Sequence, residues 1–354
     1  MWPKSWIIKS LAINLISRLP FCEQIHFWGQ KLLGKHRLDA SEMYSRALEL
    51  FRLVHHVGVS LRDKTILEIG TGWFPFVPLL SHLAGARKVI TVDIHPWLTL
   101  HNTERTVKAL EAFLDGFAHH IGQDADDLRV CYRDVRQNLE KSGTLQEFFE
   151  SINVSYICPC DITRHPIEAE SADIVFSSNV LEHIEPDLLL RIHRRTGELM
   201  NPDGLAVHRF NPGDHRQAGT GLSINFLRYP ESTWRFLGGT GLAYENRLRS
   251  CEHAELVRKA GLKLQLWADA LDQSSLEALK TGGVDLAPRF RYISQEYLCA
   301  FYSWFVVRPN SCYASLKEPS RVKWIDELLN DKPAPAGPGV ACDTGDARAS
   351  VQRL

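Results

Sequence analysis

The sequence has no excess of charge of one sign, because its 354 residues include 41 Lys and Arg against 42 Asp and Glu. Proteins that bind nucleic acid usually carry a basic excess or a basic block, so we expect no nucleic-acid partner. With 44% hydrophobic and 23% charged residues, the composition is that of an ordinary globular protein. The length fits one large domain with additions or two smaller domains. We expect a cytoplasmic location.

Cysteine pairing motifs are also lacking. The eight cysteines are scattered along the chain, and no two of them form a Cys-x-x-Cys pair. A disulfide framework or a structural zinc site normally needs closely spaced pairs, so we expect neither. The cysteines are expected to be reduced thiols that pack as small hydrophobic side chains.

No apolar run is long enough to cross a bilayer. Near the N-terminus, Lys4, Lys9 and Arg18 limit the longest uncharged run to residues 10–17, whereas a spanning helix needs about 20 apolar residues. The periodicity of residues 2–20 instead predicts an amphipathic helix ended by Pro20. Its apolar face would comprise Ile8, Leu11, Ala12, Leu15, Ile16 and Leu19. We favour packing of this face on its own domain or a partner subunit over a peripheral membrane contact.

Apolar strands alternate with helices beyond a helix expected at residues 40–57. This alternation predicts an α/β protein with a doubly wound, Rossmann-like sheet that is mostly parallel. Seven strands are expected, and the last two form a hairpin-like pair that closes the sheet with one antiparallel strand. The expected strands are residues 65–69, 88–92, 155–160, 173–176, 204–209, 262–267 and about 297–307.

Several parts of the chain exceed a minimal core of this kind. We expect a helical N-terminal extension at residues 1–60, a catalytic domain at 61–310 and a disordered tail at 331–354. Insertions at about 101–152 and 214–250 interrupt the domain. Because ligands of open α/β sheets bind beyond the carboxyl ends of the strands, we expect both insertions to help enclose a ligand.

A glycine turn follows the first strand. Glu68 lies near the end of that strand, and Gly70 and Gly72 then break it before a helix, which is a nucleotide-binding arrangement. Asp93 ends the second strand 21 residues beyond Gly72, the spacing at which a βαβ unit presents an acid to a ribose. Pro75 stands where a nicotinamide enzyme prefers a third glycine, and Glu68 would repel a pyrophosphate.

These segments together resemble the motifs of class I S-adenosylmethionine (SAM)-dependent methyltransferases. The resemblance runs in order through roughly residues 64–210 and is carried by Ile66–Gly72, Val92-Asp93, Cys160-Asp161-Ile162, Asp173–Ile184 and Asn201-Pro202-Asp203-Gly204. The fourth segment is similar to that of small-molecule methyltransferases of the ubiquinone-biosynthesis type. The resemblance implies SAM as cofactor and the following binding residues: Glu68, Gly70, Gly72, Asp93, Asp161 and Asn179.

The implied reaction is methyl transfer to a small molecule or a glycan, at a hydroxyl oxygen. The chain departs from the family pattern at Trp73 and Phe74, which replace the small residues often found after the second glycine. Two alternatives stay open at this point. One is a nicotinamide-dependent oxidoreductase on the same fold, and the other is a SAM-binding module without catalytic activity.

A hydroxyl acceptor must lose its proton, and histidine suits this task near neutral pH. His183 follows the fourth strand and His215 lies just past the fifth, so both are candidate catalytic bases. Asp214 either orients His215 or caps a turn. We expect no metal, although the sequence also allows an alternative metal group formed by Glu182, His183, Asp187, Asp214 and His215.

Four arginines lie near the expected acceptor site: Arg216, Arg228, Arg247 and Arg249. Arginine pairs well with phosphate and carboxylate groups, so these residues could bind such a group on the substrate. Surface ion pairing is the alternative role.

Overall fold

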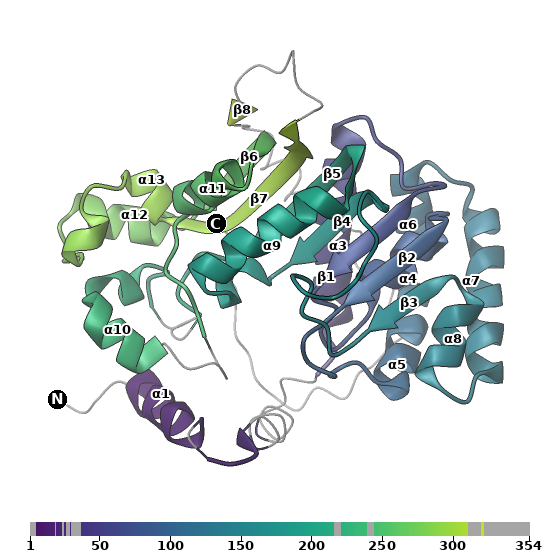
Figure 1. Ribbon diagram of the computed structural model, residues 1–354, viewed down its shortest axis with the longest axis horizontal. Coiled ribbons are helices and arrows are strands. Elements are labelled where there is room, and N and C mark those ends of the chain that lie inside the picture. Colours follow the sequence, from purple (N-terminus) through teal and green to yellow (C-terminus); the bar gives the residue numbers. More distant parts are fainter. Residues whose placement is uncertain are drawn as a thin grey trace.

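The computed structural model describes residues 5–17, 19–22, 25, 29, 37–215, 221–238, 244–310 and 320–321. Its centre is an eight-stranded sheet with the order β3-β2-β1-β4-β5-β7-β6-β8 (Figure 1). The strands are β1 Thr65–Ile69, β2 Lys88–Val92, β3 Val154–Ile157, β4 Ala172–Ser178, β5 Met200–Phe210, β6 Leu262–Leu271, β7 Ala300–Pro309 and β8 Ser320–Arg321. Strands β1 to β5 pair in parallel, and β7 runs antiparallel to both β5 and β6.

This order confirms the doubly wound sheet with an antiparallel strand. The chain winds outward from β1 to β3 and then returns to β4 and β5 on the other side of β1. The carboxyl ends of β1 and β4 therefore border the switch point, where ligands of such sheets bind. The two-residue β8, which pairs in parallel with β6, adds an eighth strand that the sequence did not predict. The expected tail at 331–354 lies outside the described residues.

Helices cover both faces of the sheet, because the strand side chains alternate between two apolar layers. Ile174 and Phe176 of β4 join the core that includes α3 and α4, whereas Val175 joins the core under α9 and α11. The helical elements are α1 Ser5–Ile16, α3 Ala40–His56, α4 Phe76–Leu83, α5 Leu100–Leu110, η1 Glu111–Phe113, α6 Leu114–Ile121, α7 Ala125–Lys141, α8 Leu145–Ser151, η2 Leu181–His183, α9 Pro186–Leu199, η3 Asn225–Arg228, α10 Glu231–Gly238, α11 Ser250–Lys259, α12 Gln273–Lys280, η4 Pro288–Phe290 and α13 Gln295–Leu298.

The insertion at 101–152 is helical, as expected, and comprises most of α5 through α8. Side-chain caps set its helix starts: Asp124 accepts hydrogen bonds from the first turn of α7, and Thr144 and Glu147 form a capping box on α8. Phe148 and Phe149 are fully buried in the core shared with α3 and α4. These two side chains therefore complete the core, and the expectation that the insertion helps to enclose a ligand stays a prediction.

The N-terminal helix α1 differs from expectation. It ends at Ile16, before Pro20, and it packs on α10, where the Asn14 side-chain amide donates a hydrogen bond to the carbonyl of Phe236. Ser10 and Asn14 are buried. On the apolar face Ile16 is half-buried, and the other residues are exposed: Ile8, Leu11, Ala12, Leu15 and Leu19. The apolar face therefore does not pack on the described part of its own domain, and its packing on a partner subunit stays a prediction. No helix in the described ranges is long and apolar enough to cross a membrane.

Candidate cofactor and acceptor site

A buried acid lies at the carboxyl end of β1. All five residues of β1 are buried, because helices cover both faces of this central parallel strand. Glu68 is 5% exposed, and the hydroxyl of Thr91 on β2 donates a hydrogen bond to its Oε2. Burial raises the pKa of Glu68 to about 8; the Thr91 hydrogen bond lowers it, and the nearby Asp93 carboxylate raises it. At neutral pH this carboxyl is therefore largely protonated, and an adjacent cation would favour its charged form.

The glycine turn after β1 contains two residues with positive φ, 88° at Gly70 and 69° at Gly72. A Cβ at Gly70 would lie 2.4 Å from a methyl group of Val180, so the turn packs closely against the loop after β4. A Cβ at Gly72 would meet nothing within 4 Å. The backbone at Gly72 thus faces open space, and a ligand could approach it closely.

Asp93, at the carboxyl end of β2, is tied to the glycine turn. Its Oδ2 accepts a hydrogen bond from the Gly72 amide at 2.8 Å, and its Oδ1 accepts one from the His95 amide at 2.9 Å. A carboxylate offers about four acceptor positions, so each oxygen keeps a second lone pair. Two neighbouring acceptors of this kind fit the two hydroxyls of a ribose.

Three stacked rings flank Asp93. Trp97 stacks on Trp73, with ring centroids 5.4 Å apart, and on His95, with centroids 4.9 Å apart. All three rings are half-buried and offer a flat apolar surface beside the glycine turn. Trp73, where the chain departs from the family pattern, thus stacks on Trp97. Sequence reasoning missed Trp97 and His95, although aromatic residues directly after Asp93 were a visible signal.

Asp161 lies in the loop after β3 and is linked to Asp93 through the backbone, because the Cys160 amide donates to the Asp93 carbonyl at 2.8 Å. Its Oδ1 accepts hydrogen bonds from the amide and the hydroxyl of Thr163, which hold the pKa of this carboxyl below its usual value. Strand β3 ends at Ile157, earlier than expected, since Pro159 has no amide to donate to the sheet.

Asn179 occupies the turn after β4 with a φ of 56°. Its side-chain oxygen accepts a hydrogen bond from the guanidinium of Arg209 on β5. Arg209 is 4% exposed and donates through Nε to Glu49 of α3 at 2.6 Å, and Trp304 of β7 donates to the same carboxylate oxygen at 3.0 Å. Three elements distant in sequence therefore fix the position of Asn179. The sequence showed no signal for Glu49 or Arg209.

The structure brings the two candidate histidines together. The rings of His183 and His215 meet edge to face, with centroids 5.2 Å apart. His183 Nδ1 lies 3.1 Å from the carbonyl of Tyr244, and His215 Nε2 lies 3.2 Å from the carbonyl of Asn211. A carbonyl can only accept, so these nitrogens carry the protons. The lone pairs are then on His183 Nε2 and His215 Nδ1, and the His183 ring is exposed.

Residues 244–246 hold both histidines from one side. The Glu245 carboxylate accepts a hydrogen bond from the His215 amide at 2.9 Å. The Asn246 amide donates to the Glu182 carbonyl at 2.9 Å, and its side chain donates to two further carbonyls of the η2 turn. Glu182 itself is buried, which raises the pKa of its carboxyl, and its Oε1 accepts from the Asn211 amide. The segment containing His183 is thus fixed by neighbours that sequence reasoning missed.

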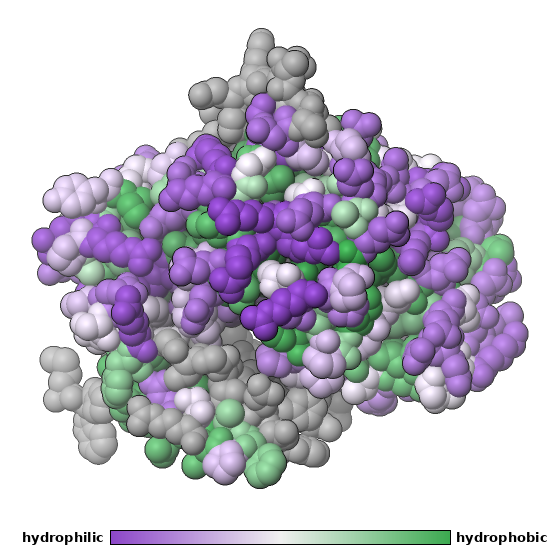
Figure 2. Space-filling view, in the orientation of Figure 1, coloured by the Kyte–Doolittle hydropathy of each residue, from purple (hydrophilic) through white to green (hydrophobic). Residues whose placement is uncertain are grey.

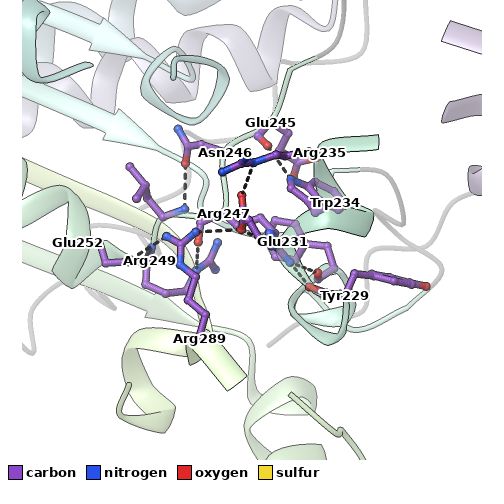
Figure 3. A network of polar contacts seen from close by, with 12 residues as sticks. Tyr229, Glu231, Trp234, Arg235, Glu245, Asn246, Arg247, Arg249, Glu252 and Arg289 are labelled. Atoms are coloured by element: carbon purple, nitrogen blue, oxygen red, sulfur yellow. Dashed lines mark hydrogen bonds and ion pairs between the residues drawn. The ribbon is translucent and has the colours of Figure 1, made fainter. Parts of the chain in front are cut away.

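Figure 3 shows a polar network that contains Arg247, Arg249 and Arg289, close to Glu245 and Asn246. Arg247 donates to the carbonyls of Phe226 and Tyr229 and to the Glu231 carboxylate, at 3.1, 2.5 and 2.6 Å. Arg289 joins Glu231 to Glu252, with nitrogen–oxygen distances of 3.3 and 2.9 Å. This network ties α10, α11 and η4 together, so Arg247 has a structural role.

The other arginines differ from Arg247. Arg228 donates to the carbonyl of Gly283 at 3.0 Å, and Arg216 lies outside the described residues. Arg249 is fully buried, and burial lowers its pKa to about 10. Its Nε donates to the Arg247 carbonyl, whereas Nη1 and Nη2 have no hydrogen-bond partner. The anion-binding role expected for these arginines stays a prediction.

The residues of the alternative metal group do not come together as ligands. Within the described part of the chain, no three His, Cys, Asp or Glu side chains are placed so that they could hold a metal ion. Asp214 is buried, and its backbone amide donates to the Ser223 carbonyl at 2.8 Å. The described structure therefore gives no support to the metal alternative, and the expectation of no metal stays a prediction.

No family model matches the sequence, and a search of curated proteins found no match. Solved structures with a similar fold include a SAM-dependent methyltransferase from Mesorhizobium loti (12% identity, TM-score 0.39, 73% of this chain and 97% of that chain). Another is a geranyl diphosphate methyltransferase (11% identity, TM-score 0.39, 73% of this chain and 75% of that chain). A third is the [4+2]-cyclase SpnF (13% identity, TM-score 0.39, 73% of this chain and 80% of that chain). Likeness at this level carries no argument about activity, which rests on the residues of this chain.

Proposed function

Since the chain has the strand order and the antiparallel β7 of the class I methyltransferase fold, we propose that it transfers a methyl group from SAM to a small molecule or a glycan. The acceptor atom in this proposal is a hydroxyl oxygen. The observation that carries the proposal is the meeting of a buried acid, an open glycine turn and Asp93 at one edge of the sheet.

The donor groups at this edge suit the cofactor part by part. Glu68 would face the amino end of the methionine portion, where a cation stabilises its carboxylate. Asp93 would accept the two ribose hydroxyls, and the rings of Trp73, His95 and Trp97 would lie beside the adenine. Asp161 and Asn179 border the same edge from the neighbouring loops. A pyrophosphate would bring no cation to stabilise the Glu68 carboxylate, which disfavours a nicotinamide cofactor.

The sulfonium of bound SAM supplies an electrophilic methyl group, so the protein must orient the acceptor and remove its proton. His183 fits the role of base because its protonated nitrogen faces a carbonyl and its Nε2 bears the lone pair. His215 supports the His183 ring from its edge. The Tyr244 carbonyl holds the His183 ring, and the Glu245 carboxylate holds the backbone amide of His215.

Release of S-adenosylhomocysteine tests this proposal. We expect the protein to release it from SAM when fractions of a metabolite extract are added, and to give no change in NADH fluorescence on mixing. SAM binding without turnover on any fraction would support a non-catalytic module instead. A change in NADH fluorescence together with the absence of SAM binding would support the oxidoreductase.

A further inference from the structure

Helix α1 has its polar side turned inward. Ser10 is 1% exposed and Asn14 is 9% exposed, and Asn14 is bonded to the backbone of α10. Leu11 and Leu15, on the other side of the helix, are 42% and 66% exposed. An amphipathic helix that served only its own domain would bury its apolar side. The exposed side of α1 therefore faces something other than this domain.

The exposed apolar side chains gather at one corner of the molecule. Of the ten large hydrophobic residues exposed in the described ranges, seven lie on α1, on the residues that follow it or on α10. We call them the apolar corner: Ile8, Leu11, Leu15, Leu19, Phe21, Ile25 and Phe236. Figure 2 shows apolar residues along the lower edge of the molecule, where Figure 1 places α1 and α10. Monomeric soluble proteins rarely concentrate exposed apolar groups in this way.

The charge of the same part of the sequence indicates what covers the apolar corner. Residues 1–37 contain six Lys and Arg and a single Glu, in a protein whose formal net charge is −1. The rest of the chain is correspondingly acidic. Two copies that met through this segment would bring like charges together, which is unfavourable. An anionic lipid surface offers the opposite charge together with an apolar interior.

We propose that the apolar corner docks on the interface of a bilayer that contains anionic lipid. The contact is peripheral: the apolar side chains enter the boundary between headgroups and acyl chains, and the net positive charge of residues 1–37 attracts the anionic headgroups.

The corner is connected to the acceptor site through α10. Trp234 of α10 donates a hydrogen bond to the Glu245 carbonyl at 3.2 Å, and the Glu245 carboxylate holds the His215 amide. Docking would thus bring a membrane surface near the candidate histidines. If the proposed function holds, on which this step rests, the acceptor class is an amphiphile that resides in the membrane, such as a glycan carried on a lipid.

Co-sedimentation of the full chain with vesicles tests the docking. We expect binding to vesicles of phosphatidylcholine with phosphatidylglycerol, and much weaker binding to phosphatidylcholine alone or at high salt. Leu11→Glu combined with Leu15→Glu should weaken binding at least tenfold. The matched control is Val130→Glu on α7, because Val130 is 46% exposed but lies outside the apolar corner. This control should bind like the wild type.

Absence of vesicle binding by the wild type would overturn the inference, as would equal binding by the double variant. Self-association of the wild type without vesicles, together with a monomeric double variant, would assign the apolar corner to contact with a second copy of the chain. This result would also overturn the inference of membrane docking. Calorimetric titration with SAM separates this result from the proposed function. The double variant should bind SAM like the wild type, which also shows that it is folded.

Discussion

Glu68 and Asp93 are neighbouring acids with different surroundings. Glu68 is buried beneath the glycine turn with one hydroxyl donor, whereas Asp93 accepts two backbone amides. The burial of Glu68 raises its pKa to about 8, so this side chain is poised to release a proton when a cation arrives. In the proposed site, Glu68 would hold the cationic end of the cofactor and Asp93 would hold its neutral diol.

The affinity for SAM should depend on pH through Glu68. Below pH 8 the free protein holds a proton on Glu68 that must leave when the cationic end of SAM binds, so affinity should rise by up to about tenfold per pH unit toward pH 8 and then level off. Titration calorimetry between pH 6 and 8.5 measures this. Glu68→Gln should remove the dependence over this range, and a wild-type affinity that is constant with pH would contradict it.

Replacement of His183 by Gln should lower kcat by about 10²- to 10⁴-fold, the usual contribution of a general base. The dissociation constant for SAM should change less than about twofold, because the ring does not belong to the proposed cofactor edge. His101→Gln is the matched control, since the His101 side chain is 76% exposed on α5. Equal losses of activity in both variants would argue against His183 as the base.

The sequence predicts those candidate site residues whose structural partners lie close to them along the chain. Gly70, Gly72 and Asp93 follow directly from a strand and a turn, so the sequence alone predicts them. Glu49 and Asn246 were missed because their partners lie 160 and 65 residues away in the chain, and only folding brings them together.

The ion pair between α3 and β5 fixes the N-terminal layer to the sheet beside Asn179. Glu49→Gln would leave the Arg209 guanidinium buried without its counter-charge, and we expect the free energy of unfolding to fall by about 3 kcal/mol. Urea denaturation measures the change. Glu42→Gln on the same helix is the control, because its ion pair with Arg46 is more exposed and should cost about 0–1 kcal/mol. Equal losses in the two variants would refute a special role for the buried pair.

Strands and helices were predicted well where one apolar pattern decided the element. The runs at β1 and β2 match the expected bounds because both strands are short and buried. Helix α7 was not recognised, since only Leu128, Tyr132 and Val135 of its residues are buried. The apolar face of α1 was recognised, but its orientation was not. Periodicity finds such a face and leaves open what it contacts.

Three fully buried histidines lie together between the sheet and the helices α9 and α11. His193 and His208 have ring centroids 5.4 Å apart, and His253 packs on Phe210 at 4.3 Å. Neither ring nitrogen of His193 or His253 has a hydrogen-bond partner. Burial lowers the pKa of His193 to about 4 and places the pKa values of the other two well below the usual value. The folded protein therefore keeps all three neutral.

This cluster should make the whole molecule sensitive to acid. A histidine whose pKa is lowered by folding gains its proton first in the unfolded state, so its contribution to stability is complete above about pH 6.5 and is lost as the pH falls toward the folded pKa. Each histidine contributes up to about 1.4 kcal/mol per pH unit in that range. His193→Leu should reduce the slope of unfolding free energy against pH by about this amount between pH 4.5 and 6.

Denaturation in urea at several pH values measures that slope. His101→Leu, a change at an exposed histidine, should leave it as in the wild type. Glu68 acts in the opposite sense, because its raised pKa makes the folded state bind the additional proton between pH 4.5 and 8. Because Glu68 is present in the wild type and in both variants, its effect cancels when their slopes are compared. Identical slopes of unfolding free energy against pH for His193→Leu and the wild type would contradict the proposed acid sensitivity of the histidine cluster.

The overall architecture could be predicted because the alternation of strands and helices extends over most of the chain. The near-balance of total charge, in contrast, conceals an uneven distribution, with a basic segment at residues 1–37 and an acidic remainder. Net charge describes long-range behaviour such as non-specific binding, and it does not report local surfaces. The membrane contact proposed for the apolar corner depends on this local imbalance.

Calorimetric titration of the folded protein with SAM tests most directly whether the carboxyl edge of β1, β2 and β4 is the cofactor site. Wild type should bind one SAM per chain. Asp93→Ala should bind about 10- to 100-fold more weakly, since hydrogen bonds to a charged group contribute about 1.5–3 kcal/mol. Asp203→Ala, at an exposed acid in β5, should bind like wild type. Failure of folded wild-type protein to bind SAM, or wild-type affinity in Asp93→Ala, would contradict this assignment.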